Sequence, residues 1–149
     1  MKIFIQIPCF NEELQIKNII EDIRKSLDTN NYDYEIVIID DGSTDRTIAI
    51  AKENGVKNIL SLKRNMGLGF AFNNGRIFAL EQGADILVNT DADNQYKSEY
   101  IKDLIENLKN SNTDIVIGVR KFDEIKHFSK SKIFLQKLGT RVVRLISGQ

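Results

Sequence analysis

Short runs of apolar residues alternate along the chain with stretches in which apolar residues recur every three to four positions. The apolar runs at residues 3–7, 35–39, 57–62, 84–89 and 114–118 predict five buried strands. Helical spacing predicts helices over residues 11–27 and 98–108, one after the loop 41–45 that ends near residue 53, and one after the turn 65–69 that ends near residue 83. A last amphipathic helix is expected from about residue 130 to residue 146. This alternation predicts an α/β fold with a mostly parallel sheet and helices on both faces.

The residue types at the helix ends support these boundaries. Asn11 is predicted to be the N-cap of the first helix, with Glu12 and Glu13 in its first turn, where the helix dipole favours acidic side chains. Gly55 is predicted to end the second helix.

Polar residues follow the predicted strands at the points where the strands end. Residues 8–12 follow the first strand, residues 40–42 the second, residues 90–95 the fourth, and Arg120 the fifth. Because ligands of parallel α/β sheets bind beyond the carboxyl ends of the strands, these clusters predict one site at that edge.

Asp91 and Asp93 form a pair of acidic residues after the fourth predicted strand. In extended backbone, residues two apart point to the same side, so both carboxylates are able to face one cation. Mg²⁺ or Mn²⁺ prefers such oxygen ligands and takes others from water and substrate phosphates. The alternative is that either Asp caps a turn or helix near Asn94.

Two further loops carry candidate ligand contacts. Carboxylates at Asp40 and Asp41 are able to accept hydrogen bonds from a nucleobase or ribose, although Ser43 or Thr44 in the same loop also suits a plain helix cap. In the second loop, Gly67 and its neighbours lack the spacing of a dinucleotide fingerprint or P-loop. They permit close backbone approach to a ligand or tight helix packing.

Composition changes this picture through the distribution of charge. The 149 residues suit one domain, and the formal net charge is zero. Residues 119–149 carry eight basic and two acidic residues, a net charge of +6, which leaves −6 for residues 1–118. Overall neutrality argues against a nucleic-acid binder, and no apolar stretch is long enough to predict a membrane span.

The basic tail and the single cysteine have further implications. In the last predicted helix, Lys130, Lys137, Arg141 and Arg144 fall roughly on one face, which suits anionic lipid headgroups. The alternative is an ordinary surface helix that packs on the sheet or on a partner chain, including a second copy. Cys9 excludes an internal disulfide and is expected to be a small buried residue.

Taken in order, these segments resemble the inverting family 2 glycosyltransferases of the GT-A fold. The resemblance rests on residues 8–13 (PCFNEE), 39–45 (IDDGSTD), 64–67 (RNMG), 91–95 (DADNQ) and 118–120 (GVR). The Asp-x-Asp variant with a following Gln is similar to that of the polyprenyl-phosphate branch, which includes dolichyl-phosphate mannose synthases. Val119 departs from that branch, which has Ser at this position.

The resemblance implies a GT-A, Rossmann-like three-layer sandwich and a role for each matching residue. Residues 1–118 would form the donor-binding core, and residues 119–149 a basic connector and helix at the acceptor or membrane side of the same domain. The implied metal ligands for Mg²⁺ or Mn²⁺ are Asp91, Asp93 and Gln95. Arg120 and Lys132 would bind acceptor phosphate, and Asp91, Asp93 and Arg120 form the implied catalytic set. The implied donor-binding residues are Pro8, Phe10, Asn11, Glu12, Asp40, Asp41, Gly42, Asn65, Gly67, Asp91, Ala92 and Asp93.

The resemblance also implies a substrate class. The expected reaction is transfer of sugar from a GDP- or UDP-sugar to a polyprenyl phosphate at the cytoplasmic face of a membrane. A phosphate acceptor is already an anionic nucleophile, so it needs no general base, and no clear candidate base is present. A saccharide or protein acceptor is the alternative. Because family members usually continue beyond this length, the chain is expected to be truncated, and a donor-binding fragment without activity remains a further alternative.

Two other protein classes share parts of the pattern. A sugar nucleotidyltransferase would have a Gly-rich loop with basic residues after the first strand, where this chain has residues 8–11 (PCFN). A receiver-like signalling module, the non-enzyme alternative, would have a phospho-acceptor Asp after the third strand, where this chain has residues 63–65 (KRN).

Overall fold

The computed structural model describes residues 1–29, 32–93, 97–119 and 141. The chain divides into two compact units, Met1–Val116 and Ile117–Gln149. The described helices and strands all belong to the first unit. In chain order they are β1 (Ile3–Cys9), α1 (Ile16–Asp28), β2 (Tyr34–Asp40), α2 (Thr47–Glu53), β3 (Asn58–Ser61), α3 (Leu68–Glu81), β4 (Ile86–Asn89) and α4 (Glu99–Asn110).

The four strands form one parallel sheet in the order β3-β2-β1-β4. β1 lies in the interior of the sheet and all seven of its residues are buried. Its carboxyl end is flanked by the ends of β2 and β4, because Cys9 pairs with Asp40 and Gln6 pairs with Asn89. The loops that follow these three strands therefore meet at one edge, as the sequence predicts.

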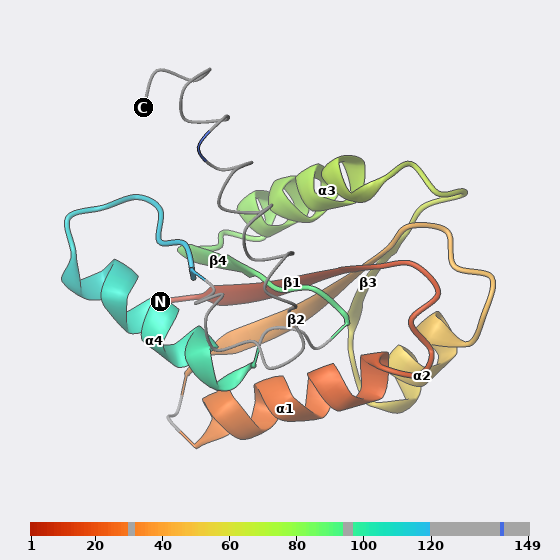
Figure 1. Ribbon diagram of the computed structural model, residues 1–149, viewed down its shortest axis with the longest axis horizontal. Coiled ribbons are helices and arrows are strands. Elements are labelled where there is room, and N and C mark those ends of the chain that lie inside the picture. Colours follow the sequence, from red (N-terminus) through yellow and green to blue (C-terminus); the bar gives the residue numbers. More distant parts are fainter. Residues whose placement is uncertain (30–31, 94–96, 120–140, 142–149) are drawn as a thin grey trace. The chain divides into compact units, whose positions relative to one another are not determined.

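Helices cover both faces of the sheet, which confirms the predicted three layers (Figure 1). The chain moves from β1 to β2 and β3 in one direction and then returns past β1 to β4. Since strand-to-strand crossovers are right-handed, this reversal places α3 on the face opposite to α1 and α2. α4 packs with α1 on the first face.

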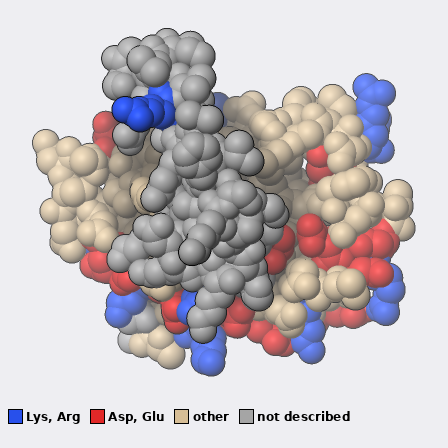
Figure 2. All heavy atoms as spheres, viewed as in Figure 1, with Lys and Arg blue, Asp and Glu red and all other residues tan. Residues whose placement is uncertain are grey.

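The two helical layers differ in the residues they bury. α1 exposes mostly polar residues and packs five large aliphatic residues against the sheet, namely Ile16, Ile19, Ile20, Ile23 and Leu27. α3 instead buries three small residues, Ala71, Gly75 and Ala79. In Figure 2, acidic and basic atoms gather along the lower edge, over α1 and α2, whereas the surface over α3 is mostly uncharged.

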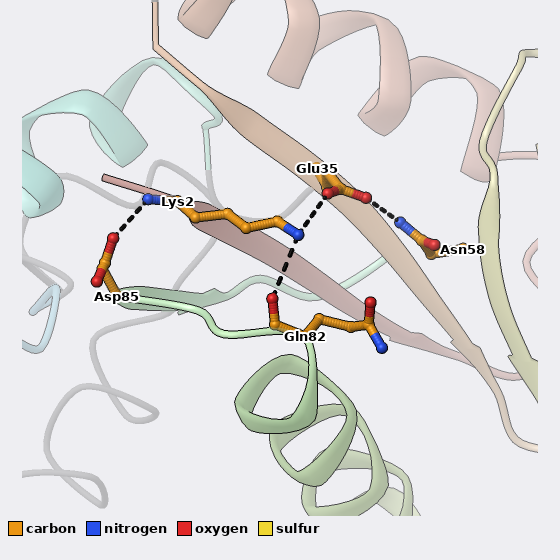
Figure 3. Close-up of polar contacts among 5 residues, drawn as sticks. All are labelled: Lys2, Glu35, Asn58, Gln82 and Asp85. Carbon is orange, nitrogen blue, oxygen red and sulfur yellow. Dashed lines mark hydrogen bonds and ion pairs between the residues drawn. The ribbon is translucent and has the colours of Figure 1, made fainter.

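A polar network fastens the amino-terminal edge of the sheet (Figure 3). The backbone N–H of Lys2 donates to Asp85 at 2.7 Å, and its ammonium group contacts Glu35 at 3.1 Å and the carbonyl oxygen of Gln82 at 3.3 Å. Asn58 donates to the second oxygen of Glu35 at 2.7 Å. Lys2 thereby links β2 to the carboxyl end of α3, where a cation is favoured by the helix dipole.

The predicted N-cap at Asn11 is wrong, because α1 begins five residues later, at Ile16, with Gln15 as its N-cap. The backbone of Asn11 is left-handed, with φ of 55°. Its side chain accepts a hydrogen bond from the N–H of Thr44 at 2.8 Å. Residues 11–15 therefore serve a contact with a distant loop, and neither Glu12 nor Glu13 lies in a first helical turn.

The predicted fifth strand is also wrong. Residues 114–118 have no regular secondary structure, and the side chains of Ile115 and Ile117 are 76% and 78% exposed. A strand requires a paired neighbour, and within the described residues none pairs with this segment. The last predicted helix lies outside the described residues, apart from Arg141, which is helical. Within the described part of the chain, no helix combines the length and the apolar character needed to cross a bilayer.

Candidate functional site

A pocket of about 370 Å³ lies beyond the carboxyl ends of β1, β2 and β4, next to the start of α3. It collects residues from all three predicted strand-end clusters that the structure describes, together with the glycine loop. The lining residues are Pro8, Cys9, Phe10, Glu12, Asp41, Asn65, Gly67, Leu68, Ala71, Asp91, Ala92 and Asp93. The prediction that these separate loops meet at one edge is therefore confirmed.

The loop after β1 is fastened to the loop before α2 by backbone-to-side-chain hydrogen bonds. The N–H of Asn11 donates to Ser43 at 2.9 Å, and the N–H of Glu12 donates to Thr47 at 2.8 Å. Asp45 accepts from the N–H of Glu13 at 3.1 Å. These bonds satisfy backbone donors that no helix uses and hold Phe10 and Glu12 at the pocket wall.

The acidic loop after β2 holds the glycine loop in place. The carboxylate of Asp41, which is buried, accepts from the N–H of Met66 at 2.7 Å and from the N–H of Gly67 at 2.8 Å. Gly42 adopts φ of 79°, and a Cβ there would lie 2.6 Å from the backbone carbon of Arg64. Asp41 and Gly42 together form a clasp that fixes this wall of the pocket.

The end of β4 is held by β1. The carbonyl oxygen of Gln6 accepts from the N–H of Thr90 at 3.1 Å, and its side-chain amide donates to Asn89 at 2.9 Å. Directly after this anchored pair, Asp91 and Asp93 line the pocket with Ala92 between them. The two carboxylates that the spacing predicts to face one cation thus border the same cavity.

The pocket is strongly acidic. Four of its lining residues are acidic, namely Glu12, Asp41, Asp91 and Asp93, and none of the lining residues in the described chain is Lys or Arg. The pKa of Glu12 is raised by burial and, next, by the nearby negative charge of Asp93. Burial, followed by the charge of Asp40, raises the pKa of the Cys9 thiol far above its ordinary value, so Cys9 is a neutral buried wall residue.

The structure separates the predicted donor-binding residues into two groups. Nine of them line the pocket, whereas Asn11, Asp40 and Gly42 do not. Asp40 is buried, and its carboxylate accepts from the N–H of Ser43 at 3.1 Å. Asn11 and Gly42 contribute through the loop contacts described above. Their roles toward a ligand stay predictions.

Three predicted metal- or phosphate-binding residues lie outside the described part of the chain, and three residues that line the pocket are not among the predicted site residues. Gln95, Arg120 and Lys132 lie outside the described residues. Leu68 and Ala71 line the pocket although they are not among the predicted site residues. Their position in the first turn of the helix after the glycine loop is the signal that identifies them. Cys9 was expected to be a buried filler, and it is buried at the pocket wall.

The donor chemistry of the pocket fits a hard divalent cation. Asp91, Asp93 and Glu12 offer carboxylate oxygens, which Mg²⁺ and Mn²⁺ favour. Within the described residues, no group of three or more His, Cys, Asp or Glu side chains suffices to hold a metal ion alone. Mg²⁺ commonly binds through one or two carboxylates and completes its shell with water and substrate phosphates, so the pair Asp91 and Asp93 is compatible with such a site.

Comparison with known proteins identifies the class of protein that this fold and pocket define. The model of the glycosyl transferase family 2 matches residues 4–143, so the chain belongs to that family. It is 36% identical over 134 residues to a UDP-N-acetylglucosamine–dolichyl-phosphate N-acetylglucosaminyltransferase of Methanococcus voltae, covering 79% of this chain and 51% of the relative. A dolichol-phosphate mannosyltransferase of Pyrococcus furiosus is 37% identical over 123 residues, covering 80% of this chain and 33% of the relative. The chain thus spans between a third and about half of the length of these two relatives.

Solved structures confirm the GT-A type of α/β fold. Glucosyl-3-phosphoglycerate synthase of Mycobacterium tuberculosis, in complex with Mn²⁺, UDP and glucosyl-3-phosphoglycerate, matches with a TM-score of 0.60 and 23% identity. The match covers 74% of this chain and 40% of that one. The TarS protein of S. aureus matches with a TM-score of 0.56 and 24% identity, covering 81% of this chain and 39% of that one.

Proposed function

We propose that the pocket binds a GDP- or UDP-sugar with Mg²⁺ or Mn²⁺ and that the protein transfers the sugar, with inversion, to a polyprenyl phosphate. The observation that carries the donor and metal parts is the acidity of the pocket, which has four carboxylates and no basic side chain among its described lining residues. A cation between a diphosphate and such a wall would offset the repulsion between their negative charges. The acceptor part is supported by the names of the relatives from Methanococcus voltae and Pyrococcus furiosus.

Each wall of the pocket has a proposed task. Pro8, Phe10 and Glu12 hold the base and ribose, and the amino end of α3 favours the negative charge of the diphosphate through its dipole. Asp91 and Asp93, with Gln95, would hold the metal ion. When bound, the ion stabilises the negative charge of the departing nucleoside diphosphate.

The proposed chemistry is a single displacement at the anomeric carbon. An oxygen of the acceptor phosphate forms a bond to this carbon on the side opposite to the diphosphate, whose bond to the carbon breaks with its electron pair. Because the acceptor oxygen is already anionic, no proton has to be removed. Arg120 and Lys132 are proposed to bind this phosphate, and the basic helix after them to lie at the cytoplasmic face of a membrane.

Ligand-induced thermal stabilisation tests the donor and metal parts. UDP, GDP and their sugars are added to the chain with and without Mn²⁺, since a bound ligand raises the unfolding temperature by mass action. We expect a shift that requires Mn²⁺, is lost in Asp93→Ala and persists in Asp103→Ala, which removes an exposed carboxylate from α4. Absence of any nucleotide shift contradicts donor binding, and a shift that Asp93→Ala leaves unchanged contradicts the metal assignment.

The acceptor needs a separate assay. Transfer of radiolabelled sugar from the stabilising donor is measured with a short polyprenyl phosphate, a free saccharide and a peptide as acceptors. Organic-phase label with the polyprenyl phosphate supports the proposal. Label in the saccharide or peptide instead identifies the alternative acceptor class, and binding of donor without transfer to any acceptor identifies a donor-binding fragment.

A further inference from the structure

α3 differs from an ordinary surface helix, because it buries small residues and exposes several large apolar ones. Its buried stripe is Ala71, Gly75 and Ala79, and a Cβ at Gly75 would lie 2.3 Å from Gln6 Oε1, so the helix backbone sits close against the sheet. Among its large apolar residues, Phe78 packs edge-to-face on Phe4 of β1, whereas the others lie away from the core. Each of four such side chains is at least 40% exposed: Phe70, Phe72, Ile77 and Leu80.

The exposed residues of α3 form a continuous face. Phe70, Asn73, Ile77 and Leu80 follow one another at intervals of three, four and three residues, which places them on one side of the helix. Leu68, at the first position of the helix, is 63% exposed and also lines the pocket. We call residues 63–80 with these exposed side chains the α3 surface.

Basic residues outnumber acidic residues at the α3 surface. Residues 63–80 include three basic residues and no Asp or Glu, and the exposed Glu81 at the end of α3 follows them, whereas residues 1–118 carry a net charge of −6. Lys63 and Arg64 are exposed just before the helix, and Arg76 is exposed on it, with its guanidinium donating to Asn73 at 2.9 Å. Exposed apolar side chains next to an excess of basic ones are typical of surfaces that lie on anionic bilayers.

We propose that the α3 surface binds an anionic phospholipid bilayer, with its apolar side chains in the headgroup region and Lys63, Arg64 and Arg76 on the lipid phosphates. A second copy of the chain is the less favoured occupant. A two-fold contact through α3 would place the excess of basic residues on one copy against the same excess on the other. The bilayer instead supplies opposite charge and apolar cover together.

Bilayer binding by the α3 surface would matter for catalysis only if the proposed function holds, and it then deepens that function. Leu68 belongs to both the α3 surface and the pocket wall. A bilayer on α3 therefore begins at the rim of the donor pocket, where a lipid-linked phosphate would have to arrive. The contact is separate from the one proposed for the basic residues of 119–149.

A single tryptophan provides a local probe, because the chain has none. Leu80→Trp places it on the α3 surface, and Tyr100→Trp places it on α4, on the opposite face of the sheet, at a side chain of similar exposure (61% and 56%). The full chain is mixed with vesicles of phosphatidylcholine with and without phosphatidylglycerol, without nucleotide or acceptor. We expect a blue shift and quenching by brominated lipid for Leu80→Trp with anionic vesicles, and neither for Tyr100→Trp.

Three results overturn the proposal. One is an unchanged Leu80→Trp spectrum while the chain still sediments with vesicles, which assigns binding to another part of the chain. Another is an equal response of Tyr100→Trp. The third is a shift of Leu80→Trp that follows protein concentration without vesicles, which assigns the face to a second copy. None of these results affects nucleotide binding, so failure here is distinguishable from failure of the proposed function.

Charge variants test the electrostatic half of the contact. Replacing Lys63, Arg64 and Arg76 together by Gln is expected to weaken binding to anionic vesicles by about tenfold to a hundredfold, from the typical contribution of basic residues near such surfaces. The matched variant replaces Lys17, Lys25 and Lys52, which are exposed on α1 and α2, by Gln. Equal losses in the two triple variants contradict a specific α3 surface.

Discussion

The clasp between the acidic loop and the glycine loop predicts a graded response to one substitution at three glycines. Gly42 combines φ of 79° with a Cβ position 2.6 Å from the backbone of Arg64. Gly67 has φ of 91° but open space around its Cβ position, and Gly69 has neither constraint. Replacing each by Ala in turn separates backbone conformation from close approach at the pocket wall.

The expected changes in the free energy of unfolding follow from the backbone conformation and from the close approach of the Cβ position to other atoms. At Gly69, in the first turn of α3, Ala should stabilise the protein through helix propensity by at most about 0.5–1 kcal/mol, the value for a helix interior. At Gly67, with ψ of 155°, the backbone conformation alone should cost about 1–3 kcal/mol. At Gly42, about 1–2 kcal/mol for the positive φ adds to about 1–3 kcal/mol for overpacking, so Gly42→Ala should cost about 2–5 kcal/mol.

Urea unfolding followed by circular dichroism measures the three differences in the free energy of unfolding. The effect of Ala on the unfolded chain is similar at all three positions and largely cancels in the comparison. Since Asp41 bonds the same loop, Gly42→Ala should also weaken the metal-dependent stabilisation by nucleotide, whereas Gly69→Ala should preserve it. Equal stability of the Gly42→Ala and Gly69→Ala variants would refute the close approach of the two loops.

Three other groups give predictions of ionisation and reactivity. Hydrogen bonds from Asn58 and Lys2 lower the pKa of Glu35, so its contribution to stability is present above the ordinary Glu pKa and is lost as the pH falls through the lower folded value. The difference in the free energy of unfolding between the protein and Glu35→Gln should therefore shrink when unfolding is measured at acid pH. A hydrogen bond to Glu106 raises the pKa of Tyr32 to about 12, and ultraviolet titration should show one tyrosine of the folded protein ionising earlier in Glu106→Gln. Cys9 should react with a thiol reagent far more slowly in the folded protein than in denaturant, and rapid labelling of the folded chain would contradict its burial.

The strands were predictable because their pattern is local. The runs at residues 3–7 and 35–39 fall inside β1 and β2, and the predicted third and fourth strands extend one or two residues beyond β3 and β4. Buried parallel strands are apolar on both faces, so an unbroken run identifies them without knowledge of their neighbours. Residues 114–118 show the limit of this reasoning, since their three central residues are also apolar and β-branched but have no partner among the described strands.

The edge of the sheet where the site lies was predictable from topology alone. Parallel strands end together, so the residues after β1, β2 and β4 had to meet. The beginning of α1 was not predictable, because Asn11 suits an N-cap in sequence and instead bonds Thr44, which is 33 residues away. The burial of small residues by α3 was also not predictable, because large apolar residues recur on several sides of this helix and its periodicity gives no single direction.

The two neighbouring acids after β2 show most clearly what the structure adds. The sequence offers both Asp40 and Asp41 for ligand contact, but Asp40 pairs with Cys9 in the sheet and does not line the pocket, whereas Asp41 does. Asp41 is already engaged by two backbone N–H groups. Each carboxylate oxygen has two lone pairs, so Asp41 retains acceptor capacity after these bonds. It is therefore able to hold the glycine loop and accept from a ribose hydroxyl or base N–H at the same time, and the loop bonds fix the direction in which its remaining lone pairs point.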